Sequence, residues 1–130
     1  MSFDSDESAP APEGVFLKSA VHPRAYGSFA RVLGRYARDE QLLSLPEAVR
    51  RMTALPAETL RLHRRGRIAP GYIADLAVFD PGTIADYATY DTPHRYARGV
   101  AHVIVNGVPE ICDGDFSGAT AGRALRRGAA

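Results

Sequence analysis

VAHVIVNGVPEIC, residues 100–112, encloses the dipeptide Asn106-Gly107 between two apolar runs. This dipeptide accepts positive φ at both central positions of a tight turn, which makes it the strongest hairpin signal in the sequence. The stretch therefore predicts two paired strands, over residues 100–105 and 108–112. A second turn is expected at Asp113-Gly114, before a tail rich in glycine and arginine.

A further strand is expected upstream of this hairpin, over residues 74–79. Leu76 and Val78 would lie on one face of it, and Ala77 and Phe79 on the other. Apolar side chains on both faces are typical of a strand that is covered on both sides. We therefore expect residues 74–79 to be buried on both faces.

Helical patterns occupy the first half of the chain. Residues 28–40, SFARVLGRYARDE, place apolar side chains at helical spacing, and Ser28 is the candidate N-cap. A second helix is expected over 44–54, because Ser44 followed three residues later by Glu47 forms a capping box. A further helical turn is expected over 56–62. Helices followed by strands indicate an α+β fold, or the junction of two domains.

Composition limits the classes of protein that this chain can represent. Its 130 residues are too few for a complete (β/α)₈ barrel, which needs about 250. A net charge of +1 argues against nucleic-acid binding, and no apolar run is long enough to cross a membrane. The acidic start is unlike a secretory signal, and Cys112 is the single cysteine, so we expect a cytoplasmic location and no disulfide.

Asp6 and Arg24 are the candidate functional residues. A loop aspartate beside an arginine would pair a general base with a group that binds carboxylates through two parallel hydrogen bonds. The alternative interpretation is a solvated acidic tail and a surface arginine. The four histidines form no H-x-H pair, and a lone histidine is more often structural than a metal ligand, so the sequence predicts no metal ligand.

Residues 22–34, HPRAYGSFARVLG, resemble the H-P-R-x-[YW]-G-[TS]-F-x-R-x-L-G segment of the N-acyl-D-amino-acid deacylases (D-aminoacylases), which are zinc-dependent members of the amidohydrolase superfamily. The block RGRIAPGYIADLAVFDP, residues 65–81, is similar to one found in many amidohydrolases. The likeness also extends over residues 43–60, 96–107, 113–114 and 118–127.

The resemblance implies a metal-bearing (β/α)₈ barrel joined to a small β-sandwich domain. Residues 1–62 would be the C-terminal end of the catalytic barrel, and residues 63–130 the C-terminal part of the β-domain. The chain would then be incomplete as an independent fold. We expect it to self-associate, or to pair with an N-terminal segment that it lacks.

The resemblance also implies a chemistry, which is hydrolysis of the amide bond of a small N-acyl-D-amino acid by a water molecule that zinc activates. Asp6 matches the family's general base, with Asp4 as the alternative, and Arg24 matches the arginine that holds the substrate carboxylate. The family's zinc ligands lie upstream of this segment, so we expect no zinc on this chain alone. A non-catalytic truncated product, or a small anion-binding or interaction module, remains the other interpretation.

Overall fold

The computed structural model describes residues 1–8 and 10–127. They form two compact units, one of residues 3–48 and 81–99, the other of residues 1–2, 49–80 and the described residues from Val100 onward. The elements are η1 (Gly14–Lys18, 3₁₀), α1 (Arg24–Arg31), η2 (Val32–Asp39, π), α2 (Leu45–Met52), α3 (Ala54–Leu60), β1 (Leu76–Phe79), β2 (Val100–Val105), β3 (Val108–Cys112) and β4 (Asp115–Phe116).

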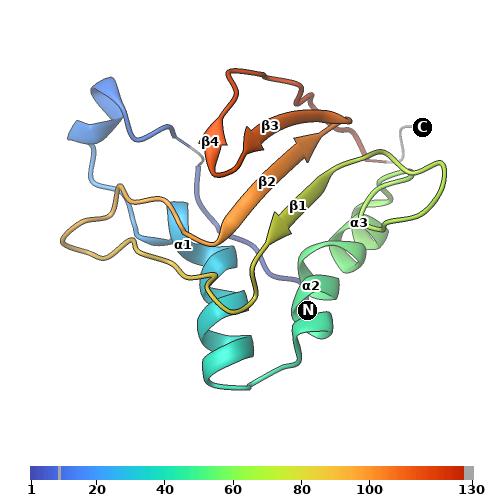
Figure 1. Cartoon of the computed structure of the whole chain (residues 1–130), viewed down its shortest axis with the longest axis horizontal. Coiled ribbons are helices and arrows are strands. Elements are labelled where there is room, and N and C mark those ends of the chain that lie inside the picture. Colours follow the sequence, from blue (N-terminus) through green and yellow to red (C-terminus); the bar gives the residue numbers. More distant parts are fainter. Residues whose placement is uncertain (9, 128–130) are drawn as a thin grey trace. The chain divides into compact units, whose positions relative to one another are not determined.

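The strands form one antiparallel sheet in the order β1-β2-β3-β4 (Figure 1). Asn106 and Gly107 adopt φ values of 50° and 81°, so the predicted hairpin is confirmed. Asp113 and Gly114 repeat this geometry, with φ values of 51° and 89°, and lead into β4, a strand that the sequence did not predict. The α+β class is therefore confirmed in its coarse form, as helices with an antiparallel sheet.

The expectation that residues 74–79 are buried on both faces is wrong for this chain. Val78 is 48% exposed, and Leu76 and Phe79 are only partly covered. The described chain pairs β1 with β2 alone, and the residues of β1 keep part of their surface exposed. The apolar run predicted the strand, which the structure places at Leu76–Phe79, but the cover over its faces depends on tertiary packing.

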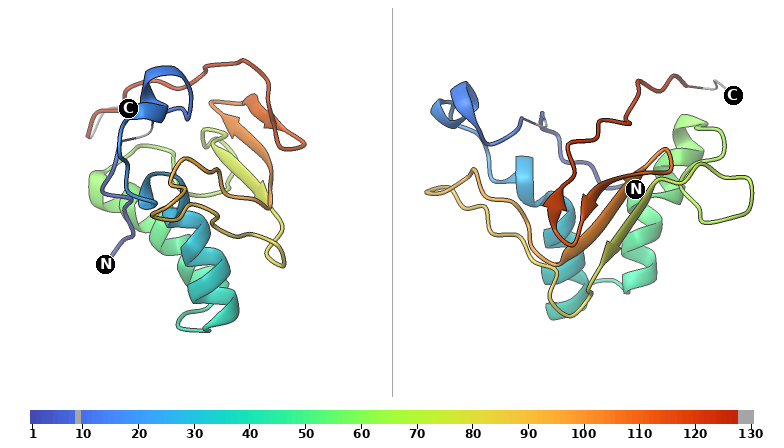
Figure 2. Two further views of the ribbon diagram at one scale, coloured as in Figure 1. Left: turned by 90° about the vertical axis from the view of Figure 1, so that its left-hand side faces the viewer. Right: turned by 45° about the horizontal axis from the view of Figure 1, so that its top comes forward.

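The first long helix begins four residues earlier than the sequence predicted. α1 starts at Arg24, and Ser28 lies inside it, where its Oγ donates to the Arg24 carbonyl at 2.8 Å. The two views of Figure 2 show α1 and η2 as one continuous rod. The prediction of Ser28 as N-cap is therefore wrong, because Pro23 has a helical φ of −51° and lets the helix start before the apolar pattern does.

The capping box predicted at the start of α2 is confirmed by the hydrogen bond between its N-cap side chain and the backbone three residues later. The Ser44 Oγ accepts a hydrogen bond from the Glu47 backbone N–H at 3.4 Å. α2 ends at Met52, and α3 begins at Ala54, two residues before the predicted start at Pro56. Pro56 fits in the first turn of α3, where its missing N–H has no helical partner to lose.

The unit of residues 3–48 and 81–99 is built around Ile84, which is 1% exposed. A Cβ at Gly34 would lie 2.3 Å from the Ile84 carbonyl oxygen, so only glycine allows η2 to come this close. The Arg38 Nη1 donates to the Ile84 carbonyl at 2.9 Å and to the Gly82 carbonyl at 3.1 Å. These contacts hold the irregular segment 81–99 along the helix.

In the other unit, several polar contacts meet at the turn between β2 and β3. The Asn106 side chain accepts from the Arg65 Nη2 at 2.9 Å and donates to the Ala121 carbonyl at 2.6 Å. Its backbone N–H donates to the Asp75 Oδ1 at 2.9 Å, and Arg65 forms an ion pair with Asp75. Asn106 therefore forms part of the turn and also links it to the segments that carry Arg65, Asp75 and Ala121.

No helix in the described part of the chain is long and apolar enough to cross a bilayer. The proposed boundary between residues 1–62 and 63–130 stays a prediction.

Candidate functional site

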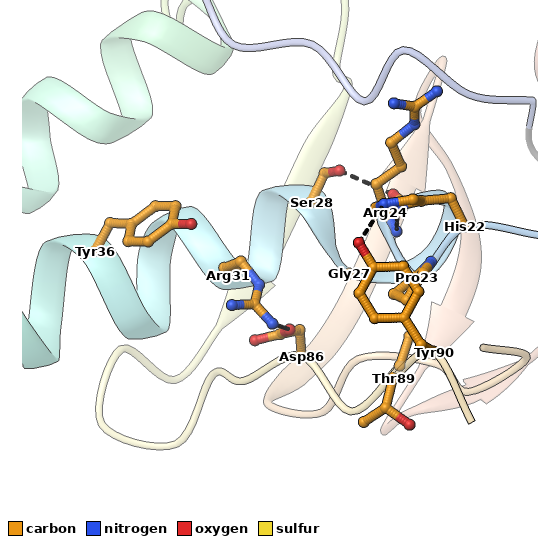
Figure 3. A pocket seen from close by; sticks show the side chains of 11 residues that line it. His22, Pro23, Arg24, Gly27, Ser28, Arg31, Tyr36, Asp86, Thr89 and Tyr90 are labelled. Atoms are coloured by element: carbon orange, nitrogen blue, oxygen red, sulfur yellow. Dashed lines mark hydrogen bonds and ion pairs between the residues drawn. The ribbon is translucent and has the colours of Figure 1, made fainter. Parts of the chain in front are cut away.

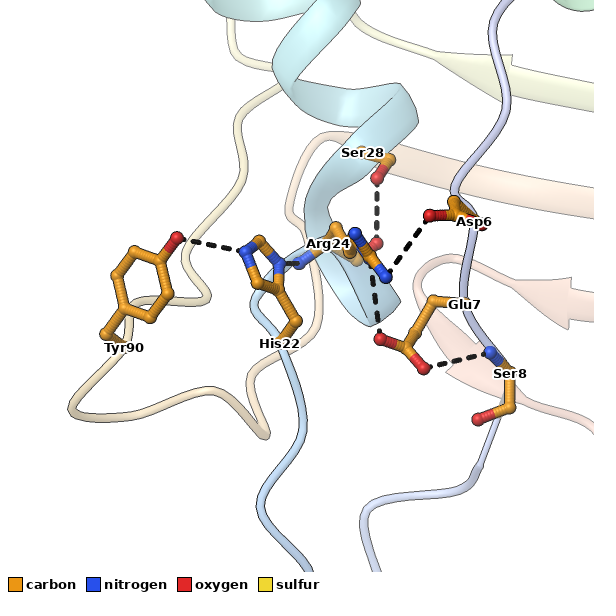
Figure 4. A network of polar contacts seen from close by, with 7 residues as sticks. All are labelled: Asp6, Glu7, Ser8, His22, Arg24, Ser28 and Tyr90. Atoms are coloured by element: carbon orange, nitrogen blue, oxygen red, sulfur yellow. Dashed lines mark hydrogen bonds and ion pairs between the residues drawn. The ribbon is translucent and has the colours of Figure 1, made fainter.

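The guanidinium of Arg24 meets two carboxylates from the N-terminal segment. Its Nη2 lies 3.3 Å from the Asp6 Oδ2, and its Nε lies 3.5 Å from the Glu7 Oε2 (Figure 4). Nε and Nη2 form the side edge of a guanidinium, the edge that a single carboxylate binds through two hydrogen bonds. The structure thus brings together the two residues that the sequence singled out, and it adds Glu7.

The Asp6 carboxylate is the most accessible member of this group. The Asp6 side chain is 84% exposed, against 42% for Arg24 and 24% for Glu7. Asp6 also has a φ of 51°, a left-handed conformation that aspartate tolerates better than most residues. Asp4, the alternative general base, is exposed on the same segment.

The backbone of Arg24 is held as well as its side chain. The His22 Nδ1 accepts from the Arg24 N–H at 3.0 Å, and the Ser28 Oγ donates to the Arg24 carbonyl. The His22 Nε2 lies 2.9 Å from the Tyr90 hydroxyl, and the two rings meet edge to face at 5.1 Å. Sequence reasoning missed His22 and Tyr90 as partners, because 68 residues separate them.

A cleft of about 460 Å³ opens beside these residues. Arg31 and Asp86, which also line it, form an ion pair with 2.7 Å between the Arg31 Nη2 and the Asp86 Oδ2 (Figure 3). The Arg31–Asp86 pair is partly buried, with Asp86 only 14% exposed. The cleft is lined by His22, Arg24, Arg31, Asp86 and Tyr90 together with Pro23, Gly27, Ser28, Tyr36, Ala88 and Thr89. Its volume lies within the range of small-molecule sites in proteins.

An aromatic cluster fixes the N-terminal segment near α1. The Tyr26 hydroxyl donates to the Pro10 carbonyl at 3.0 Å, and the His94 Nε2 donates to the Phe16 carbonyl at 3.0 Å. Tyr96 packs edge to face on Tyr26, with ring centres 5.8 Å apart, and desolvation raises its pKa. These anchors hold the segment that carries Asp6 and Glu7 beside Arg24.

The residues that the structure describes do not assemble a metal site. Among residues 1–8 and 10–127, no three His, Cys, Asp or Glu side chains come together as a metal-binding group. A catalytic zinc needs three protein ligands. Cys112 is exposed at the end of β3 and belongs to no such group.

Comparisons with known proteins relate this chain to amidohydrolases. Residues 17–110 match the sequence model of a protein family that is described as "Amidohydrolase family". D-aminoacylase of Alcaligenes xylosoxydans xylosoxydans is 50% identical over 109 residues, which cover 84% of this chain and 22% of that protein. The chain therefore spans about a fifth of the length of this relative.

Solved structures agree with the sequence likeness. A crystal structure of D-aminoacylase matches with a TM-score of 0.79 at 50% identity, over 82% of this chain and 22% of that one. N-acyl-D-glutamate deacylase of Bordetella bronchiseptica matches with a TM-score of 0.68 at 50% identity, over 72% of this chain and 20% of that one. That enzyme was solved with zinc and a phosphonate inhibitor that mimics the tetrahedral intermediate of its reaction.

Proposed function

This chain belongs to the amidohydrolase family, and on that premise we propose that it is the C-terminal part of a zinc-dependent enzyme that hydrolyses the amide bond of N-acyl-D-amino acids. The observation that carries the proposal is the 50% identity to D-aminoacylase over 109 residues. The likeness to N-acyl-D-glutamate deacylase supports the same class of substrate.

The fold supports separate places for the two halves of this chain in such an enzyme. Residues 1–62 would end the catalytic barrel, and residues 63–130 would contribute strands to the small β-sandwich domain. The partly covered strands support this, because a sheet face that lacks a second layer gains stability when one is added. We keep the cytoplasm as the expected location of the protein.

Arg24 would bind the α-carboxylate of the substrate. Its Nε and Nη2 already hold carboxylate oxygens, those of Glu7 and Asp6, at 3.5 and 3.3 Å. A substrate carboxylate that takes this edge replaces both with one bidentate partner, whose planar geometry also fixes the substrate's orientation. Binding would therefore release Asp6 from Arg24 at the time when a base is needed.

Asp6 would act as the general base. Its exposed carboxylate would take a proton from the water that attacks the amide carbon, and a C–O bond forms as this proton leaves. The same proton would then pass to the nitrogen when the C–N bond breaks, so that the amine leaves as a neutral group. One carboxylate can serve both transfers because it ends the cycle deprotonated.

The described residues hold no cluster that fits the zinc of this chemistry, so its ligands would come from other parts of the enzyme.

The decisive test is the coding sequence immediately upstream of Met1, together with an assay. If the reading frame continues into an H-x-H motif and barrel strands, the longer protein should be expressed and offered N-acetyl-D-methionine and its L-isomer. We expect hydrolysis of the D-isomer only, and no turnover by the 130-residue chain.

Two results would favour the other interpretations. A reading frame that starts at Met1, with no longer product in the cell, would support a truncated, non-catalytic protein. Binding of N-acetyl-D-methionine by the 130-residue chain, without turnover and abolished by Arg24→Ala, would in that case support a small anion-binding module.

A further inference from the structure

The first turn of α1 lacks an ordinary cap. The residue before the helix is Pro23, which has no side-chain acceptor, and yet the N–H groups of the first turn all have partners. Ala25 donates to the His22 carbonyl at 3.0 Å, and Gly27 donates to the Pro23 carbonyl at 3.1 Å. The Arg24 N–H donates to the His22 Nδ1 at 3.0 Å, so the imidazole replaces the missing capping side chain.

This contact also determines where the proton of the neutral His22 ring lies. An Nδ1 that accepts a hydrogen bond carries no proton, so the proton must be on Nε2. Nε2–H then donates to the Tyr90 hydroxyl oxygen, 2.9 Å away. The Tyr90 hydroxyl oxygen accepts this proton, and the edge-to-face contact at 84° fixes the orientation of the ring.

We propose that His22, oriented by Tyr90, is a positioning residue for the Arg24 guanidinium. The inference rests on the proposed role of Arg24 in binding carboxylates, and it adds a residue that supports this role. Arg24 is the first residue of α1, the place where a helix frays most easily. With its N–H held by His22 and its carbonyl held by the Ser28 Oγ, the start of its side chain is fixed, and the guanidinium edge is presented in one place.

The test uses the 130-residue chain and variants at His22. Loss of one net hydrogen bond should speed exchange of the Arg24 amide proton about fivefold in His22→Ala. Nitrogen relaxation of the Arg24 Nε should show that the guanidinium becomes less ordered. His22→Asn should restore both readouts, because an asparagine side chain accepts from the N–H two residues on, the same spacing as His22 to Arg24.

His102→Ala is the matched control. The His102 Nδ1 accepts from the Asp113 N–H at 3.3 Å, a bond of the same kind between residues of the other compact unit. This variant should speed exchange at Asp113 and leave Arg24 unchanged. If His22→Ala does not fold, Tyr90→Phe takes its place, since it keeps the ring contact and removes only the hydroxyl, and the Arg24 Nε should again lose order.

Equal exchange and equal order at Arg24 in wild type and His22→Ala would overturn the proposal, and so would a failure of His22→Asn to rescue. Titration with N-acetyl-D-alanine separates this proposal from the proposed function. If the ligand shifts no Arg24 signal in any variant while the exchange pattern holds, the carboxylate-binding role fails and the positioning role stands. If it binds wild type, we expect about fivefold weaker binding to His22→Ala and recovery in His22→Asn.

Discussion

At the scale of single residues, the guanidinium of Arg24 depends on its shape as well as its charge. Replacement by lysine keeps the charge but removes the planar edge that meets two oxygens at once. In the complete enzyme, we expect Arg24→Lys to lower kcat/KM for N-acyl-D-amino acids by about 10- to 100-fold, the scale of one charged hydrogen-bonded pair. Metal content should be unchanged, and activity equal to wild type would contradict the assigned role.

Asp6 can be separated from its neighbour Asp4 by the same substitution at each position. Asp6→Asn removes the proton acceptor but keeps the size of the side chain, so kcat should fall by about 10²- to 10⁴-fold. Asp4→Asn should leave kcat near the wild-type value. If the effects are reversed, Asp4 is the base, and the contact between Asp6 and Arg24 is an ordinary surface ion pair.

At the scale of elements, the close approach of η2 to the segment 81–99 depends on Gly34. An added methyl group would meet the Ile84 carbonyl oxygen at 2.3 Å, and this clash outweighs the helix propensity that alanine would gain. We expect Gly34→Ala to lower the free energy of unfolding by about 1–3 kcal/mol in chemical denaturation.

Gly122→Ala is the control for this substitution, because a Cβ at Gly122 meets no atom within 4 Å. Its unfolding free energy should stay close to that of the wild type. A Gly34→Ala protein as stable as the wild type would show that segment 81–99 can move away from the helix at little cost.

At the scale of the whole molecule, the 130-residue chain should bind less than one equivalent of zinc after dialysis. The physical reason is that the described residues bring no three potential ligands together. Elemental analysis measures this directly. Stoichiometric zinc would contradict the prediction and would require ligands that the described structure does not assemble.

The apolar surface of the isolated chain should also promote self-association. Phe29, Val78 and Phe116 are 46%, 48% and 67% exposed, and β1 is an edge strand in the described sheet. We expect dimers or larger species in light scattering at micromolar concentration, with binding of a dye that reports apolar surface. Val78→Lys should reduce both signals, because a charge on an edge strand opposes pairing.

A monodisperse monomer with a sharp melt and no dye binding would contradict this prediction. Two of the apolar side chains at helical spacing in residues 28–40, Val32 and Leu33, are buried within the chain, at 6% and 8% exposure, so they do not add to this surface. Phe29 and Leu45 remain exposed, the latter at 36%.

The sequence by itself determined the features that depend on near neighbours. Asn106-Gly107 specified its hairpin because few residue pairs accept positive φ twice, and Ser44 with Glu47 specified the start of α2. The likeness to the deacylases was also readable from local motifs, and it pointed to Arg24.

Only the tertiary structure decided what depends on residues far apart in the chain. Ser28 looked like an N-cap because the apolar pattern begins there, but Pro23 and the His22 ring start the helix at Arg24. The contact between His22 and Tyr90 has no local signal, since hydrogen bonds across 68 residues leave no periodic pattern in a sequence. The meeting of Arg24 with Asp6 and Glu7 likewise depends on anchors such as the bond from Tyr26 to Pro10, which pack the N-terminal segment beside the helix.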